Sequence, residues 1–157
     1  MFKKVLIANR GAVAARIIRA LRKLNIQSVA VYSEADASAP YLKDANEAIL
    51  IGPGPAKASY LNQAALFKAI ADSGADAVHP GYGFLSENAA FARKLESKGV
   101  TFIGPSQEWL EKMGDKVESR KLMAEYGVPM LVASSLLPDD EASIISAGER
   151  IGYPLLI

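Results

Sequence analysis

Residues able to take part in chemistry are concentrated in residues 79–88, which read HPGYGFLSEN. The stretch holds the only histidine of the chain, His79, together with Tyr82, Glu87 and two glycines that permit backbone geometry closed to other residues. It is expected to follow a strand and precede a helix, and open α/β sheets bind ligands at that carboxyl edge. Tyr82 and Glu87 are therefore candidate ligand contacts, whereas His79 is expected to form a local hydrogen bond within a demanding turn. Because no serine–histidine–aspartate set or metal-ligand spacing accompanies them, we expect one wall of a site rather than a complete catalytic unit.

Lys116 is a second candidate, within MGDKVESRKLM at residues 113–123. The DKVE capping-box pattern predicts that a helix begins at Asp115, which puts Lys116 in the first turn. A lysine at that position opposes the helix dipole, so contact with a phosphate at the helix N-terminus is one interpretation. The other is an exposed lysine on an amphipathic helix, and local physics favours neither.

A cationic helix face is predicted near the N-terminus, where no acidic residue occurs between Ala12 and Leu24. Three- and four-residue spacing places Arg16, Arg19 and Lys23 on this face. A solvated face is the default interpretation, and a protein–protein contact is the sharper alternative because interfaces favour arginine. Nucleic-acid binding would require a wider basic surface or interleaved aromatic residues, and neither is apparent.

The elements that would position these residues follow an alternating pattern. Short apolar runs predict strands at residues 4–8, 28–32, 48–51, 77–79 and 100–103. Helical spacing separates them, including a helix expected to be capped by Ser59 and ended by Gly74. Strands separated by helices imply right-handed βαβ units and a parallel sheet, so the first hundred residues predict a Rossmann-like α/β domain. Only Gly11 of a G-x-G-x-x-G fingerprint is present, which argues against binding of NAD or FAD.

The pattern changes after Pro105. Helices are expected from Ser106 to Met113, from Asp115 toward Tyr126 and from the PDDE segment at 138–141, followed by a strand at YPLLI. This change of pattern indicates that a different region follows the Rossmann-like domain.

Composition narrows the class of protein. The chain has 157 residues, 50% of them hydrophobic, and a formal net charge of +1, so it predicts a packed core and no global attraction to nucleic acid or an acidic membrane. It has no cysteine, which excludes disulfides and thiol catalysis and fits a reducing compartment. No apolar run approaches the ~20 residues needed to span a bilayer, and no signal peptide is visible. A cytoplasmic location is expected.

Six segments, in order and at the expected spacing, resemble the biotin carboxylase family. This family comprises the ATP-grasp components of acetyl-CoA, propionyl-CoA and other acyl-CoA carboxylases, of pyruvate carboxylase and of urea carboxylase. The segments are VLIANRGAVAARIIRA, YSEADA, HPGYGFLSENAAFA, FIGPS, MGDK and RIGYPLLI. HPGYGFLSEN together with MGDK is highly specific, whereas the first segment alone would not be.

The resemblance implies a Rossmann-like pre-ATP-grasp domain over residues 1–114, then linker helices and the first strand of an ATP-grasp domain over 115–157. The implied reaction uses ATP with Mg²⁺ (or Mn²⁺) and bicarbonate to form carboxyphosphate, and then carboxylates biotin on a separate carrier domain. A carboxyltransferase and a second copy of the chain are the other implied partners. The alternatives are another ATP-grasp ligase, such as a carbamoyl-phosphate synthetase, and a non-catalytic nucleotide-binding or assembly module.

Individual positions also follow from the resemblance. Lys116 matches the family lysine that contacts ATP, Tyr82 matches the loop tyrosine close to the biotin ring, and Glu87 falls in the same polar network. The loop at 79–88 and Lys116 are then expected to line a common cleft. The first helix lies near the dimer interface in bacterial members, which favours a partner for its cationic face.

Two departures from the family pattern matter. Ala12 stands where the family usually has glutamate, so a favourable acid worth a few tenths to ~1 kcal/mol is missing from a helix N-terminus. The chain also ends at Ile157, before the expected second ATP lysine, glycine-rich lid, metal-binding carboxylates, bicarbonate-binding arginine and catalytic base. We therefore expect no catalytic residue and no metal ligand in this chain, and no turnover by it alone.

Overall fold

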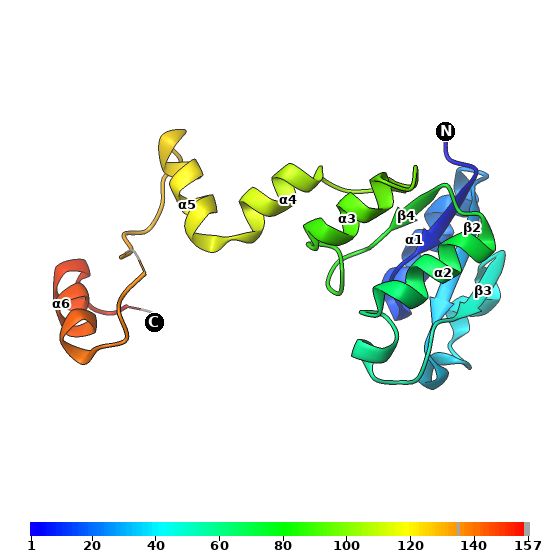
Figure 1. The fold of residues 1–157 in the computed structure, drawn as a ribbon, viewed down its shortest axis with the longest axis horizontal. Helices are drawn as coiled ribbons and strands as arrows, with labels where there is room; N and C mark the ends of the chain where they lie inside the picture. The colour runs from blue at the N-terminus through cyan, green and yellow to red at the C-terminus, as the bar shows by residue number, and fades with distance from the viewer. Residues whose placement is uncertain (135, 156–157) are drawn as a thin grey trace. The chain divides into compact units, whose positions relative to one another are not determined.

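The computed structural model describes residues 1–134 and 136–155, and the chain divides into two compact units, Met1–Leu110 and Glu111–Ile157 (Figure 1). The first unit holds all five strands of the described residues, and the second is helical. Within the described residues, no helix has the length and apolar character required to cross a membrane.

The first unit is built on a parallel sheet with the strand order β3-β2-β1-β4-β5. Ile7 of β1 lies opposite Ala30 of β2 on one side and opposite His79 of β4 on the other. This arrangement confirms the α/β class with a Rossmann-like parallel sheet. The order also reverses at β1, so a topological switch point lies between the carboxyl ends of β1 and β4. The strands are β1 (Lys4–Ile7), β2 (Gln27–Tyr32), β3 (Glu47–Leu50), β4 (Ala77–His79) and β5 (Thr101–Phe102).

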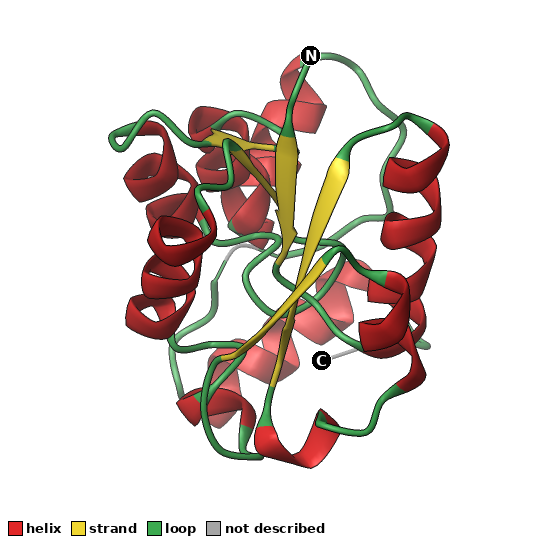
Figure 2. Ribbon diagram, turned by 90° about the vertical axis from the view of Figure 1, so that its right-hand side faces the viewer, coloured by secondary structure: helices red, strands yellow, loops and turns green. Residues whose placement is uncertain are grey.

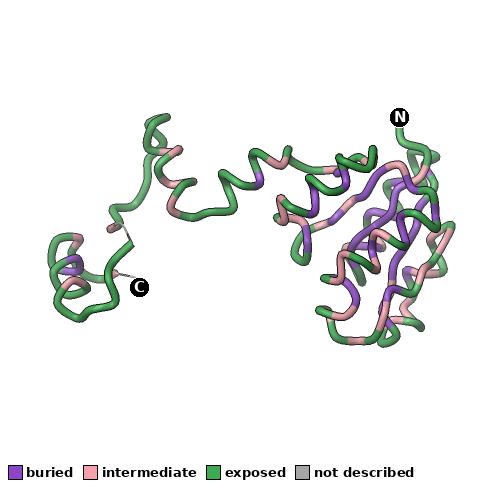
Figure 3. Tube along the Cα trace, viewed as in Figure 1, coloured by how far each residue is buried: buried purple, intermediate pink, exposed green. Residues whose placement is uncertain are grey.

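Helices cover both faces of this sheet. Val5 and Ile7 pack with Ile18 of α1 (Gly11–Lys23), whereas Leu6 packs in a second cluster with residues of α2 (Gln63–Ser73) and α3 (Ala89–Glu96). Successive side chains of a strand point to opposite faces, which explains why β1 is a continuous apolar run with no polar alternation. Figure 2 shows helices beside the strands, and Figure 3 shows that the strands contain much of the buried chain.

The start of α2 differs from the sequence-based expectation. The helix begins at Gln63 and is capped by Asn62, whose side chain accepts a hydrogen bond from the Ala65 amide at 3.2 Å. Ser59 is fully buried, and its hydroxyl donates to the carbonyl of Pro55 at 3.0 Å. The predicted Ser59 cap was therefore wrong, because this hydroxyl is used locally around the short 3₁₀ helix η3 (Ala56–Ala58). The expected stop is confirmed, since Gly74 has φ of 65° and adopts the left-handed conformation that ends helices.

The N-terminus of α1 has weak capping. Arg10 occupies the cap position without a side-chain cap hydrogen bond, and the first turn contains no acidic residue. Ala12 is exposed in that turn. A glutamate there would meet the positive end of the helix dipole, so Ala12 removes a favourable interaction from a helix that also lacks a side-chain cap.

The second unit contains α5 (Lys116–Glu125) and α6 (Glu141–Ile151), while α4 (Gln107–Gly114) includes residues of both units. The helix expected from the PDDE segment begins at Glu141, where the Asp140 carboxylate accepts from the Ser143 amide at 2.8 Å. Residues 153–155, the described part of the expected C-terminal strand, form no strand, and residues 156 and 157 lie outside the described residues. The functional boundary after residue 114 stays a prediction.

Candidate functional site

Asn9 holds the loop that follows β4. It lies just beyond β1 and is only 3% exposed. Its Nδ2 donates to the carbonyl oxygens of Pro80 and Tyr82 at 2.8 and 2.9 Å, while its Oδ1 accepts from the Arg10 amide at 2.9 Å. The segment after β1 and the loop after β4 are therefore joined at the switch point, where open α/β sheets place ligands.

Gly81 allows this close approach. Its φ is +65°, a region that residues with a Cβ rarely adopt. A Cβ at this position would lie 2.6 Å from Val13 Cγ1 and 2.8 Å from Asn9 Nδ2. Both the backbone conformation and the available space therefore require glycine.

His79 serves the same turn. Its Nδ1 accepts a hydrogen bond from the Gly81 amide at 3.0 Å, and its backbone carbonyl accepts from the Ala8 amide at 2.9 Å. Burial lowers the pKa of His79 below its ordinary value of 6.5, so the imidazole is neutral at pH 7. The expectation of a local hydrogen bond is confirmed.

Phe84 anchors the other side of the loop. It has a positive φ of 45° and stacks on Tyr60, with the ring centroids 5.1 Å apart. The Tyr60 hydroxyl donates to Asp36 Oδ2 at 2.6 Å and accepts from the Ser33 amide at 3.0 Å. Asp36 ends the 3₁₀ helix η1 (Glu34–Asp36), which follows β2. Segments that follow three different strands thus support one loop.

Arg10 completes this support. Its Nη2 lies 2.7 Å from Asp36 Oδ1, and its guanidinium carbon lies 5.6 Å from the Tyr60 ring centroid. Burial, followed by the hydrogen bond to Asp36, raises the pKa of Tyr60, so this phenol stays protonated at neutral pH. Sequence reasoning missed the roles of Asn9, Asp36 and Tyr60. The available signal was a polar residue soon after each buried strand.

Tyr82 and Glu87 are exposed residues of this supported loop, and Tyr82 is 76% exposed. Glu87 directly precedes Asn88, whose side chain caps α3 by accepting from the Phe91 amide at 2.8 Å. Neither the phenol nor the carboxylate makes a hydrogen bond with any other described residue in residues 1–134 and 136–155. Their assigned roles stay predictions.

Lys116 is the first residue of α5, as expected, and it is exposed. Asp115 Oδ1 accepts from the amides of Val117 and Glu118 at 2.8 and 2.9 Å. Two amides that an anion would use are therefore already satisfied, so a phosphate contact would depend on the lysine ammonium. Among the described residues, this ammonium has no ion pair or hydrogen-bond partner. The cleft expected to contain both Lys116 and the loop at 79–88 stays a prediction.

The cationic face of α1 is exposed as well. Arg16, Arg19 and Lys23 form no ion pair with a described residue. Arg22, on the same helix, instead bonds the carbonyl and carboxylate of Asp44 at 2.6 and 3.3 Å. The three predicted interface residues therefore leave their charges available to solvent or to a partner.

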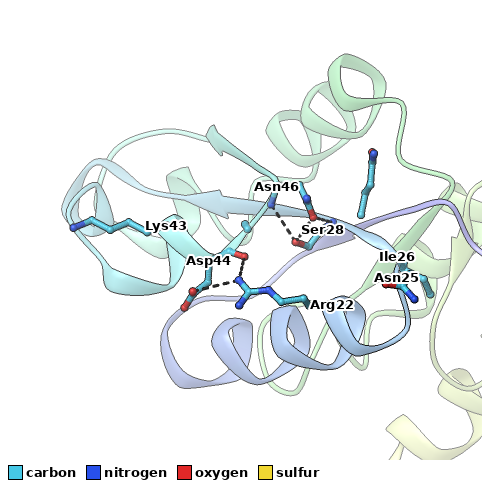
Figure 4. Close-up of a pocket in the computed structure, with 9 residues that line it drawn as sticks. Arg22, Asn25, Ile26, Ser28, Lys43, Asp44 and Asn46 are labelled. Atoms are coloured by element: carbon cyan, nitrogen blue, oxygen red, sulfur yellow. Dashed lines mark hydrogen bonds and ion pairs between the residues drawn. The ribbon is translucent and has the colours of Figure 1, made fainter.

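An open pocket of about 460 Å³ lies at the opposite, amino-terminal edge of the sheet (Figure 4). Its lining includes Arg22, Ser28, Asp44 and Asn46, several of which bond to one another; Ser28 Oγ, for example, lies 3.1 Å from Asn46 Oδ1. These contacts join α1 to the segment before β3, which gives the pocket walls a structural role.

Residues 1–110 match a family model described as "Biotin carboxylase, N-terminal domain". The chain belongs to this family. The carboxyl edge of its sheet, with the loop at 79–88, is thus part of a biotin carboxylase N-terminal domain. The match favours the carboxylase over the carbamoyl-phosphate synthetase alternative.

Relatives extend the similarity across the chain. It is 48% identical over 157 residues to a biotin carboxylase of Halalkalibacterium halodurans, covering 100% of this chain and 35% of that protein. It is 49% identical over 155 residues to the mitochondrial methylcrotonoyl-CoA carboxylase subunit alpha of Glycine max, covering 99% of this chain and 21% of that protein. The chain thus spans about a third or less of these relatives' lengths.

A solved relative is similar in structure. The biotin carboxylase domain dimer of Hydrogenobacter thermophilus 2-oxoglutarate carboxylase, in complex with MgADP, ADP and bicarbonate, matches with a TM-score of 0.91 and 47% identity. The match covers 98% of this chain and 34% of that chain.

Proposed function

We propose that this chain is the N-terminal part of a biotin carboxylase, which uses ATP and bicarbonate to carboxylate carrier-bound biotin through carboxyphosphate. The family match over residues 1–110 carries the proposal. The solved complex with MgADP and bicarbonate supports the choice of nucleotide and substrate. A biotin carrier domain and a carboxyltransferase complete the proposed enzyme, and the cytoplasmic location stays a prediction.

We propose that Tyr82 and Glu87 face the biotin side of the site. The Tyr82 ring is largely exposed, while its carbonyl is fixed by Asn9, so it offers an apolar surface from a backbone that is already ordered. Such preorganisation lowers the entropy cost of binding a ring system. Glu87 adds a carboxylate on the same loop.

Lys116 is proposed to contact a phosphate of ATP. An ammonium with no partner among the described residues breaks no ion pair when it approaches a phosphate. Its position beside Asp115 also makes the side chain, and not the capped helix amides, the group that meets negative charge.

We propose that the metal-dependent part of the reaction uses residues outside this chain. Residues 1–134 and 136–155 contain no group of three or more histidine, aspartate or glutamate side chains placed to hold a metal ion. The described residues therefore offer no Mg²⁺ or Mn²⁺ site built from three or more such side chains. Lys116 alone cannot neutralise the charge that develops on carboxyphosphate, so we propose that this chain binds and positions but does not catalyse.

ADP release by the full-length protein tests the proposed function. We expect release that depends on both bicarbonate and biotin, and no release above background from residues 1–157 alone, since the proposed metal-binding and catalytic groups lie outside them. A coupled spectrophotometric assay with each substrate omitted in turn makes the measurement. ATP hydrolysis indifferent to biotin would contradict the proposed reaction, and turnover by the 157 residues would contradict the division of roles.

The cationic face of α1 is proposed to contact a second copy of the chain, as its exposed, unpaired charges and the dimeric solved relative suggest. Arg19→Glu is expected to weaken self-association of the full-length protein at least about tenfold, because a mismatched charge at an interface costs several kcal/mol and about 1.4 kcal/mol is a tenfold change. Sedimentation velocity measures the dissociation constant. Lys57→Glu is the control, because Lys57 is also exposed and forms no ion pair with a described residue. An unchanged profile for Arg19→Glu would assign this face to solvent.

A further inference from the structure

The hydrogen bonds of Asn9 go to backbone groups of the two segments that meet at the switch point. Its two donated bonds reach the carbonyls on either side of Gly81, and one of those carbonyls belongs to Tyr82 itself. The acceptor oxygen is occupied by the Arg10 amide. Asn9 therefore ties the exposed Tyr82 side chain to the end of β1 through the Tyr82 backbone.

Asparagine is suited to this position for a chemical reason. Its amide nitrogen offers two N–H donors and its oxygen an acceptor, on a side chain short enough to stay beside its own backbone. Aspartate has the same shape but donates nothing when ionised, so it would present negative charge to the Pro80 and Tyr82 carbonyls.

The side-chain hydrogen bonds of Asn9 reach the loop after β4 and the Arg10 amide, and not a strand of the sheet. Its loss should therefore affect the loop more than the sheet. The Tyr82 carbonyl would lose its anchor, while the anchor at Phe84, through Tyr60 and Asp36, would remain. This separation makes an effect on Tyr82 distinguishable from general unfolding.

We propose that Asn9 is a positioning residue for biotin, acting through the carbonyls of Pro80 and Tyr82 to hold the Tyr82 ring where biotin docks. The proposal rests on the proposed function. It adds a residue that touches no substrate and nevertheless sets the affinity for one.

The test uses Asn9→Asp in the full-length protein, with free biotin as the variable substrate. Losing the donated hydrogen bonds to the Pro80 and Tyr82 carbonyls is expected to raise the KM for biotin about tenfold to a hundredfold. The KM for ATP should stay within about twofold, a split that a general structural defect would not produce.

Asn25→Asp is the matched control, since Asn25 is exposed and distant in sequence from the loop. Asn9→Ser keeps one donor, so it should give an intermediate biotin KM and serves if Asn9→Asp fails to fold.

A double variant shows whether Asn9 acts through Tyr82. With Tyr82→Ala already present, adding Asn9→Asp should change the biotin KM by less than about twofold, because interacting residues are not additive. Fully multiplicative effects would overturn the proposal.

Hydrogen exchange provides a readout that does not depend on activity. In Asn9→Asp or Asn9→Ser, the Gly81 amide, which bonds His79 Nδ1, should exchange at least about tenfold faster, while amides of β1 keep their protection. Unchanged exchange would overturn the inference. Faster exchange with a normal biotin KM would overturn it too, yet leave the proposed function intact. Wild-type protein with no biotin-dependent turnover would refute both.

Discussion

Gly81→Ala is expected to lower the free energy of unfolding of the chain by about 2–5 kcal/mol. A left-handed conformation costs a residue with a Cβ about 1–2 kcal/mol, and overpacking costs about 1–3 kcal/mol more. The added Cβ would meet Val13 Cγ1 at 2.6 Å and Asn9 Nδ2 at 2.8 Å. Neither neighbour yields easily, because Val13 is β-branched and Asn9 is held by three hydrogen bonds.

Gly83→Ala is the matched control for this effect. Gly83 has a similar φ of +72°, but a Cβ there would meet nothing within 4 Å. It should therefore lose only the conformational part, about 1–2 kcal/mol. Urea unfolding followed by circular dichroism measures both variants. Equal losses of unfolding free energy in the two variants would show that Asn9 and Val13 leave room for a Cβ at residue 81.

Lys116→Ala is expected to raise the KM for ATP of the full-length protein about tenfold to a hundredfold, as a hydrogen bond to a charged group contributes about 1.5–3 kcal/mol. The basis is the proposed phosphate contact of an ammonium that has no partner among the described residues. Initial rates at varied ATP and saturating bicarbonate and biotin make the measurement. The KM for biotin should change by less than about twofold.

Lys121→Ala is the control on the same helix. Lys121 is exposed and its Nζ lies 2.6 Å from Glu118 Oε1, so its removal deletes a surface ion pair without affecting the proposed phosphate contact. Its KM for ATP should match that of the wild type. If Lys116→Ala matched the wild type as well, Lys116 would be an ordinary surface lysine on an amphipathic helix.

The loop at 79–88 shows how these expectations fit together. Its backbone is hydrogen-bonded to Asn9 and its Phe84 ring stacks on Tyr60, whereas Tyr82 and Glu87 are exposed. A site assembled from several chain segments benefits from this arrangement, because ordered backbone need not be ordered again when a ligand arrives. Asn9 and Gly81 thus support the same turn, because the Asn9 side chain bonds the carbonyls on either side of Gly81 and packs where a Cβ of residue 81 would lie.

Ala12 departs from the glutamate that is usual in the family, and this weakens the N-terminus of α1. The first turn of α1 has neither an acidic residue nor a side-chain cap, and Ala12 is exposed within it. The helix nevertheless forms over Gly11–Lys23, with Ile18 and Leu21 buried against the sheet. Burial of such apolar side chains contributes about 1.5–3 kcal/mol each, more than the few tenths to ~1 kcal/mol of the missing acid.

The sequence by itself determined the parallel sheet, because a strand buried on both faces must be apolar throughout, as Val5, Leu6 and Ile7 are. Left-handed glycines such as Gly74 were equally predictable, since only one residue type tolerates that conformation freely. The family was also apparent, because HPGYGFLSEN with MGDK is a specific pair of motifs.

Only the tertiary structure decided what supports the loop. Asn9 and Pro80, or Asp36 and Tyr60, are far apart along the chain, and no spacing rule relates them. The same holds for the cap of α2, where Ser59 and Asn62 were both chemically able to cap and packing assigned the role to Asn62. Residue types show which groups are able to form hydrogen bonds. A hydrogen bond between distant segments, however, exists only once the sheet has brought the carboxyl ends of β1, β2 and β4 to one edge.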